Sequence, residues 1–115
     1  MTITELQPGE IFVFGSNASG SHGAGAARTA YEKFGAVWGQ GHGPQGQSYG
    51  IDTMSGFETI EREVARFLEF AGEHPELRFL VTKIGCGIAG YTPAQIAPLF
   101  RSVPDNVVLP EEFVA

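Results

Sequence analysis

The chain has few of the residues that define several large classes of protein. Cys86 is its single cysteine, so no internal disulfide can form, and seven Lys and Arg residues against 13 Asp and Glu residues give a formal net charge of −6. Chains with few cysteines are typical of reducing compartments, and a chain without a basic cluster has little to neutralise the phosphates of a nucleic acid. We therefore expect a cytoplasmic protein that does not bind nucleic acid.

Long apolar runs, a signal sequence and metal-ligand patterns are also missing. The apolar segments fall far short of the roughly 20 residues that cross a membrane, and residues 1–10 lack the basic start and apolar stretch of a secretory signal. One cysteine and three scattered histidines show no spacing typical of a zinc site. We expect no membrane association, no metal and no cofactor, and the sequence does not indicate whether there is a protein partner.

Glycine is the residue in excess, with 16 among 115 residues against roughly 7% in an average protein. The length and the hydrophobic content of 43% fit one globular domain over residues 1–115. Many of the glycines gather in two segments, which we name the first glycine loop (residues 15–25, GSNASGSHGAG) and the second glycine loop (residues 85–90, GCGIAG). A backbone without side chains lets a ligand approach its N–H groups, so both loops are candidates for a binding site.

Strand-like and helix-like segments alternate along the chain. Strands are predicted at residues 10–14, 47–53, 78–84 and 106–109, with a further short one at 36–38, and helices at 26–34, at 57–72 and from Thr92 onward; residues 39–46 read as a flexible loop. This alternation predicts an α/β fold, a three-layer α/β/α sandwich around a mixed, mostly parallel sheet.

Capping patterns mark the starts of two of these helices. Ser55 and Glu58 form a capping-box pattern before residues 57–72, and Thr92 and Gln95 form another, with a proline at the first helical position. Pro98 lies inside the later helix and is expected to shorten it. The aromatic residues Tyr31, Phe34 and Trp38 are expected to pack in the core or against a helix, rather than to form a platform for adenine.

The first glycine loop joins a predicted strand to a helix, where the free N–H groups of the first turn can bind a phosphate without a basic side chain. Two common nucleotide-binding patterns, G-x-x-x-x-G-K-[ST] and G-x-G-x-x-G, do not fit it. The second glycine loop also follows a predicted strand, and ligands of α/β sheets bind beyond the carboxyl ends of strands. Both loops are therefore expected to line one site. The alternative is that their glycines only permit tight turns and close helix–sheet packing.

Three features taken together resemble the macrodomain family over about residues 10–100: a strand ending at Asn17, a glycine loop opening a helix of small residues, and the stretch G-x-G-I-x-G-[FY]-x-P at residues 85–93. The resemblance implies a site for ADP-ribose or a close relative. Asn17 would face the distal ribose, the two glycine loops would hold the diphosphate, and Tyr91 would flank the ribose. The ligand-binding residues it implies are Gly15, Ser16, Asn17, Gly20, Gly23, Ala24, Gly25, Ala26, Gly85, Cys86, Gly87, Ile88, Ala89, Gly90 and Tyr91.

A few side chains near the loops are candidates for chemistry. Asn17 and His22 are the catalytic candidates; His22 can act as an acid, a base or a ribose partner near neutral pH, or it is a solvent-facing residue without a role. Cys86 is either a nucleophile activated by a nearby helix start or a small apolar filler, and the second interpretation is the stronger. His42 is a candidate to cover the ligand within a mobile flap. Asp52 and Thr53 end a strand and are candidates to face the same site, but an Asp at this position is equally typical of a turn.

Two functions of different classes use this predicted site. The first is an enzyme that hydrolyses an ADP-ribosyl linkage by positioning a water at the anomeric carbon. The second is a non-catalytic module that binds or sequesters ADP-ribose or a related nucleotide signal. A structural role without a ligand is a third and weaker interpretation, and the lack of a strong acid–base pair favours binding slightly over hydrolysis.

Overall fold

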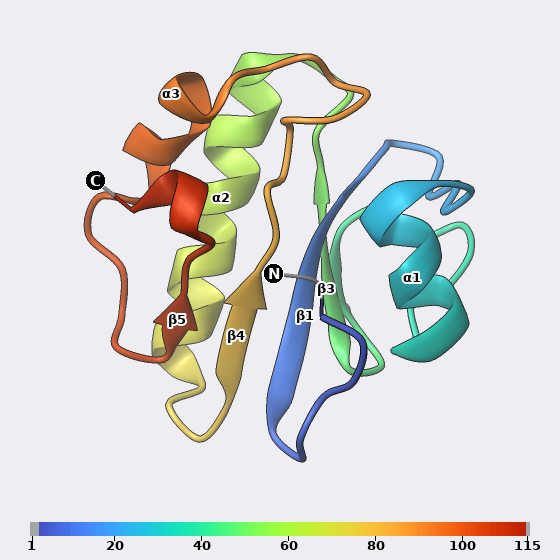
Figure 1. The fold of residues 1–115 in the computed structure, drawn as a ribbon, viewed down its shortest axis with the longest axis vertical. Coiled ribbons are helices and arrows are strands. Elements are labelled where there is room, and N and C mark those ends of the chain that lie inside the picture. Colours follow the sequence, from blue (N-terminus) through green and yellow to red (C-terminus); the bar gives the residue numbers. More distant parts are fainter. Residues whose placement is uncertain (1–2, 115) are drawn as a thin grey trace.

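A computed structural model describes residues 3–114 of the chain, whose secondary-structure elements alternate between strand and helix (Figure 1). In chain order they are β1 (Glu10–Ser16), α1 (Gly25–Lys33), β2 (Gly43–Gln45), β3 (Ser48–Asp52), α2 (Phe57–Glu73), β4 (Arg78–Val81), α3 (Pro93–Ile96), the 3-10 helix η1 (Ala97–Phe100), β5 (Val107–Val108) and the 3-10 helix η2 (Glu111–Phe113).

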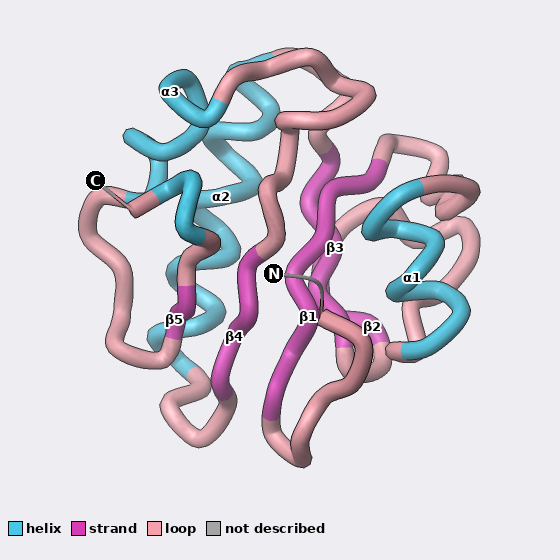
Figure 2. Tube along the Cα trace, viewed as in Figure 1, coloured by secondary structure: helices cyan, strands magenta, loops and turns pink. Residues whose placement is uncertain are grey.

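The strands form one five-stranded sheet in the order β2-β3-β1-β4-β5 (Figure 2). β1 pairs in parallel with both β3 and β4, and β4 pairs in parallel with β5. Only the edge pair β2 and β3 is antiparallel. The prediction of an α/β fold with a mixed, mostly parallel sheet is confirmed.

Successive residues of β1 point to opposite faces of the sheet, and each face is covered by helix. Phe12 and Phe14 pack with Ala27 and Ala30 of α1 on one face. Val13 belongs to a larger core on the other face, which contains the buried residues of α2 and α3. Figure 1 shows the same division, with α1 on one side of the sheet and α2 and α3 on the other. A strand covered on both faces reads as a continuous apolar run, as residues 10–14 do.

The helix predicted at residues 57–72 is present as α2, but its predicted capping box is not. Gly56 is the N-cap, and no side chain caps the helix. The Ser55 hydroxyl instead donates to Asp52 Oδ2 at 2.6 Å. The Asp52 carboxylate at the end of β3 is a charged acceptor, which makes a stronger hydrogen bond than a backbone amide offers.

The capping box at α3 is confirmed, because the Thr92 side chain accepts from the Gln95 backbone while the Gln95 side chain accepts from the Thr92 backbone. α3 lasts only to Ile96 and continues as η1, as expected from Pro98. The strands predicted at residues 78–84 and 106–109 are both shorter, and end at Val81 and Val108.

Residues 36–46 differ most from the prediction. Residues 36–38 form no strand, whereas residues 43–45 of the segment predicted to be flexible form β2. The backbones of Gly20 and Gly41 pack closely against other segments of the same chain. A Cβ on Gly20 would overlap Gln40, and a Cβ on Gly41 would overlap Asn17. Glycine is therefore needed at both positions so that residues 39–41 can pack against the first glycine loop, and residues 43–45 of the predicted flap pair with β3.

The three predicted core aromatics divide. Phe34 is buried, as predicted, but Tyr31 and Trp38 are 46% and 52% exposed. Their rings pack edge to face at 5.3 Å and lie beside the buried imidazole of His22. Neither residue is in the core, where the His22 ring lies instead, but Trp38 packs on Tyr31 of α1, which agrees with the prediction of helix packing.

Candidate functional site

The two glycine loops meet where neighbouring parallel strands send their chains to opposite faces of the sheet. The chain leaving β1 enters α1 on one face, and the chain leaving β4 enters α3 on the other. β1 and β4 are adjacent in the sheet. Such a switch point leaves a crevice beyond the carboxyl ends of the strands, and this crevice is where open α/β sheets bind ligands.

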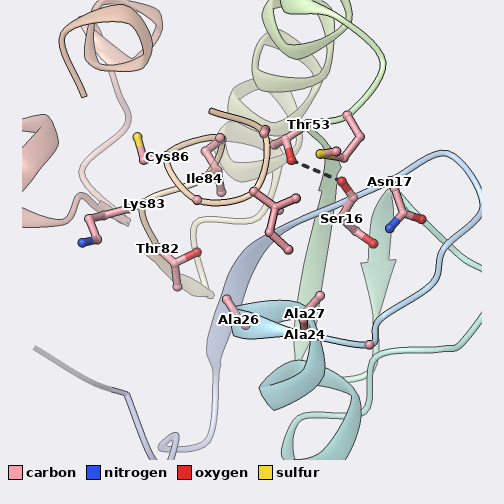
Figure 3. A pocket seen from close by; sticks show the side chains of 18 of the residues that line it. Ser16, Asn17, Ala24, Ala26, Ala27, Thr53, Thr82, Lys83, Ile84 and Cys86 are labelled. Carbon is pink, nitrogen blue, oxygen red and sulfur yellow. Dashed lines mark hydrogen bonds between the residues drawn. The ribbon is translucent and has the colours of Figure 1, made fainter. Parts of the chain in front are cut away.

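A cleft of about 600 Å³ occupies this position, and its walls are the two glycine loops (Figure 3). The volume lies within the range of roughly 300–1,000 Å³ usual for small-molecule sites. Twelve of the predicted ligand-binding residues line it: Gly15, Ser16, Asn17, Gly23, Ala24, Gly25, Ala26, Gly85, Cys86, Gly87, Ile88 and Ala89. The fold thus brings together two segments that are about 70 positions apart in the sequence.

One wall of the cleft is the N-terminus of α1, which has no side-chain cap. Ala24 is the N-cap and has no side-chain acceptor to offer. Within the described residues, the backbone N–H groups of residues 23–27 donate to no protein acceptor. Free N–H groups at a helix start carry partial positive charge and bind anions. This wall can therefore hold a phosphate.

The opposite wall is the second glycine loop. Its ends are closed by hydrogen bonds from Gly90 N to Gly87 O and from Tyr91 N to Gly85 O. The N–H groups of residues 87–89, at the tip, donate to no acceptor in the part of the chain that the structure describes. Ile88 at this tip is 81% exposed. Figure 3 shows Cys86 of this wall, and Ile84 just before it, across from Ala24, Ala26 and Ala27.

The floor of the cleft contains residues that were not among the predicted ligand-binding set. Thr53 and Thr82 follow the ends of β3 and β4, and their hydroxyls donate to the backbone carbonyls of Ser16 and Val13, at 3.2 and 2.7 Å. The remaining additions are Ser21, Ala27, Met54, Lys83 and Ile84. The expectation that Thr53 faces the cleft is confirmed. Thr82 follows a strand predicted parallel to β1, so the rule that identified the glycine loops could have identified it too.

Lys83 and Cys86 are the ionisable side chains of the cleft lining. The Lys83 ammonium lies 3.6 Å from the Glu112 carboxylate, outside the glycine loops. Burial raises the pKa of the Cys86 thiol, an effect that the nearby charge of Lys83 opposes and that of Glu112 reinforces. A raised pKa keeps the thiol protonated near neutral pH, which agrees with the interpretation of Cys86 as a filler rather than a nucleophile.

Asn17 lines the cleft, but its amide is engaged within its own loop. Its Nδ2 donates to Ser21 O at 3.0 Å, and its Oδ1 accepts from Ser21 N at 2.9 Å and from Ser19 Oγ at 2.9 Å. These bonds fold residues 17–21 back on themselves. In this structure the Asn17 side chain shapes the first glycine loop.

His22, expected at the cleft, does not line it. Its side chain is fully buried, with Nδ1 2.9 Å from Ser16 Oγ and Nε2 2.8 Å from Val37 O. A carbonyl only accepts, so in the neutral ring Nε2 carries the proton and Ser16 donates to Nδ1. Both nitrogens are occupied, which contradicts the expectation of an accessible histidine. The glycines near His22 predicted an exposed loop, but in the structure Gly20 allows the backbone to pack closely against residues 39–40.

Three further predicted residues lie outside the cleft lining: Gly20, Gly90 and Tyr91. Gly20 packs against residues 39–40. Tyr91 packs on Phe57, with ring centroids 5.6 Å apart, and its N–H closes the second glycine loop. Gly90 and Tyr91 therefore shape the loop from outside the cleft.

Within residues 3–114, no group of three or more His, Cys, Asp or Glu side chains is arranged to hold a metal ion. No helix in the same range is both long enough and apolar enough to cross a membrane. Comparisons of the chain with protein-family models, curated proteins and solved structures found no match.

Proposed function

We propose that the cleft binds ADP-ribose or a related nucleotide diphosphate-ribose. The observation that carries the proposal is the pair of facing walls, in which the free N–H groups of residues 23–27 and 87–89 border the same space. A diphosphate is the ligand group that uses two sets of backbone donors at once. The resemblance to macrodomains rests on these same loops and supports a ribose-linked diphosphate.

Binding without turnover is the activity that the cleft supports best. Hydrolysis needs a group that activates water, and of the two ionisable groups in the lining, Lys83 lies against Glu112 and Cys86 has a raised pKa. The two catalytic candidates, Asn17 and His22, are already engaged by protein partners. A sensing or sequestering role in the cytoplasm is consistent with a chain whose single cysteine is free.

Titration calorimetry with ADP-ribose, ADP, ribose 5-phosphate and AMP tests the proposal. ADP-ribose and ADP should bind, whereas ribose 5-phosphate and AMP should bind more weakly because each has a single phosphate. Trp38 is the only tryptophan and lies next to Gly23 of the cleft wall, so its fluorescence gives an independent readout. No binding of any diphosphate at millimolar concentration would exclude the proposed function.

Incubation with an ADP-ribosylated peptide separates the binder from the hydrolase. For a binder, the peptide should remain intact and should compete with free ADP-ribose. If the wild type releases ADP-ribose from the peptide faster than a Gly87→Val variant does, the protein is a hydrolase and not a binding module.

A further inference from the structure

A second hollow, of about 380 Å³, adjoins the cleft at Asn17. Asn17 lines both spaces, so the hollow lies immediately beyond one end of the cleft. Its other walls come from His42, the residue after Gly41, and from one side of α2. This side of α2 contributes Arg62, Glu63 and Arg66. Neither the cleft nor its proposed ligand accounts for these charged side chains.

Glu63 is a carboxylate in an unusual place, because its side chain is only 9% exposed on a helix whose neighbouring residues form the core. Its Oε1 accepts from Asp52 N at 3.2 Å. Its Oε2 lies 3.6 Å from His42 Nδ1 and accepts no hydrogen bond from any described residue. Every fully buried side-chain N or O atom in the described chain has a partner. Oε2 is therefore open to the hollow.

Arg62 and Arg66 lie one turn apart on α2 and line the same hollow. No ion pair within 4.0 Å in the described residues involves either one. The shortest contact of Arg62 is a marginal hydrogen bond of 3.5 Å to Thr59 Oγ1. Two guanidinium groups without a carboxylate partner, four residues apart on one helix face, can bind one oxyanion together.

Asp52, the other acidic residue of the hollow, is occupied elsewhere. Its Oδ1 accepts from Met54 N at 3.0 Å and its Oδ2 from Ser55 Oγ at 2.6 Å. Both bonds hold the turn between β3 and α2. The charges left facing the hollow are therefore Arg62, Arg66 and Glu63, together with His42 when it is protonated.

We propose that this hollow is a second, oxyanion-binding subsite that takes a phosphate group through Arg62 and Arg66. Glu63 limits its affinity through like-charge repulsion, and Oε2 accepts from a hydroxyl carried beside the phosphate. The charged groups of the subsite come from outside the two glycine loops, and its binding of phosphate does not require the cleft to be occupied. The phosphate is either free or part of a ligand that extends past Asn17 from the cleft.

Inorganic phosphate is the probe, titrated at constant ionic strength and followed by backbone amide NMR. Saturable shifts should appear at residues 59–66 and 42. The double variant Arg62→Gln/Arg66→Gln should weaken this binding at least about tenfold, because it removes both charge-assisted contacts. Glu63→Gln keeps the size and the acceptor for Asp52 N but removes the negative charge, so it should strengthen binding severalfold.

Two control variants keep the test specific. Arg101→Gln removes one exposed positive charge outside the hollow and should leave phosphate binding unchanged. Gly87→Val alters the cleft wall, so it should weaken any phosphate shifts at residues 23–27 and 87–89 and leave those at residues 42 and 59–66 unchanged. Phosphate shifts that vanish with Gly87→Val and persist in the double arginine variant would assign the anion to the cleft and overturn the subsite. Equal phosphate affinity in the wild type, the double variant and Arg101→Gln would overturn it as well.

A second arm identifies the source of the phosphate and separates the subsite from the proposed function. If the phosphate belongs to the ligand of the cleft, pre-saturation with ADP-ribose should change the phosphate affinity, and the double arginine variant should bind a longer phosphorylated ligand less tightly than the wild type does. If the phosphate is free, both ligands should bind independently. If the protein binds phosphate through Arg62 and Arg66 but binds no ADP-ribose, the result supports the subsite and excludes only the function proposed for the cleft.

Discussion

The Nδ1 atom of His22 lies 2.9 Å from Ser16 Oγ at the end of β1, and both residues belong to the first glycine loop. The opposite nitrogen of the ring reaches Val37 O at 2.8 Å, and the ring packs edge to face on Phe14 with centroids 5.3 Å apart. One buried imidazole thus connects the central strand, the loop that forms a cleft wall and the segment that supports this loop. The geometry of the cleft depends on an interior residue that does not touch it.

His22→Ala should therefore destabilise the fold by about 3 kcal/mol, since it leaves a cavity and two buried polar atoms without partners. Urea unfolding followed by circular dichroism measures the change in the free energy of unfolding. His74→Ala is the matched control, because His74 pairs with Glu76 at the protein surface and such pairs contribute little. Equal effects of the two substitutions would mean that His22 is not the link between these segments.

Gly87→Val should weaken ADP-ribose binding at least about tenfold, or 1.4 kcal/mol, and leave the unfolding temperature within a few degrees of the wild type. Nothing in the protein lies within 4 Å of a Cβ at Gly87, so a new side chain on this residue of the cleft lining fits without a clash. Gly72→Val is the control, because Gly72 also has open space around it but lies on α2, outside the cleft. Titration calorimetry on both variants checks the expectation.

Gly25 is a poorer position for this experiment, although it also lines the cleft. Its φ of +61° is a backbone conformation that side chains with a Cβ rarely adopt. A substitution there would strain the start of α1, and a loss of binding would not separate a filled cleft from a displaced helix. Normal ADP-ribose affinity in a folded Gly87→Val protein would show that the diphosphate does not contact the second glycine loop.

Alkylation of Cys86 by iodoacetamide should be slow at pH 8 and should accelerate as the pH rises toward the raised pKa of the thiol. Burial raises the pKa of the thiol, so the folded protein holds a smaller fraction of reactive thiolate at pH 8 than the same chain unfolded in urea. The ratio of the folded to the unfolded rate should therefore increase with pH. Mass spectrometry at several pH values measures both rates, and a folded protein that reacts faster than the unfolded chain at pH 8 would restore Cys86 as a nucleophile.

The same measurement tests the position of the ligand. Cys86 lines the cleft, so saturating ADP-ribose should slow its alkylation by occupying the space through which the reagent approaches. AMP, which is expected to bind more weakly, should protect less at the same concentration. A rate unchanged by saturating ADP-ribose would place the ligand elsewhere.

The sequence predicts the location of the cleft well, because the rule for it depends only on the order of the elements. Gly15 and Gly85 each follow a strand, and parallel strands bring such positions to one edge of the sheet. The same rule applies to Thr53 and Thr82, because each follows the end of a strand. Periodicity and apolar runs also predict α2 and β1 to within a few residues, since both bury most of their apolar side chains.

The roles of individual polar side chains are less accessible to sequence reasoning, because they depend on contacts across the fold. His22 lies in a segment of glycine and serine, a pattern typical of an exposed loop. It is buried nevertheless, and Ser16 and Val37 supply its hydrogen-bond partners. Ser55 matches a capping box, but Asp52 provides a better acceptor. Glu63 has the charged side chain of a surface residue, although it lies three residues after Ile60 on the buried face of α2. The groups that accompany its burial become evident only once His42 and Asp52 are placed beside it.

Asn17 gives the sharpest test of how the first glycine loop contributes to binding. Its amide makes three hydrogen bonds, all to residues 19 and 21. If these bonds shape the wall, Asn17→Ala should lower stability by about 1–2 kcal/mol and weaken ADP-ribose binding together, because the loop loses the conformation that presents the N–H groups of residues 23–27. Urea unfolding and titration calorimetry on one preparation give both quantities.

Asn17→Asp separates shaping of the loop from direct contact with the ligand. Aspartate keeps the acceptor for Ser21 N and Ser19 Oγ and loses only the donor to Ser21 O, so its stability should be closer to that of the wild type than that of the alanine variant. A carboxylate facing a diphosphate would repel it, whereas one turned into the loop would be neutralised by its donors. An aspartate variant that retains most of the stability and most of the affinity would establish Asn17 as a loop-shaping residue. An aspartate variant that keeps the stability but loses more affinity than the alanine variant would show instead that the side chain faces the phosphates. In that case the Asn17 amide would have to leave Ser21 when the ligand enters.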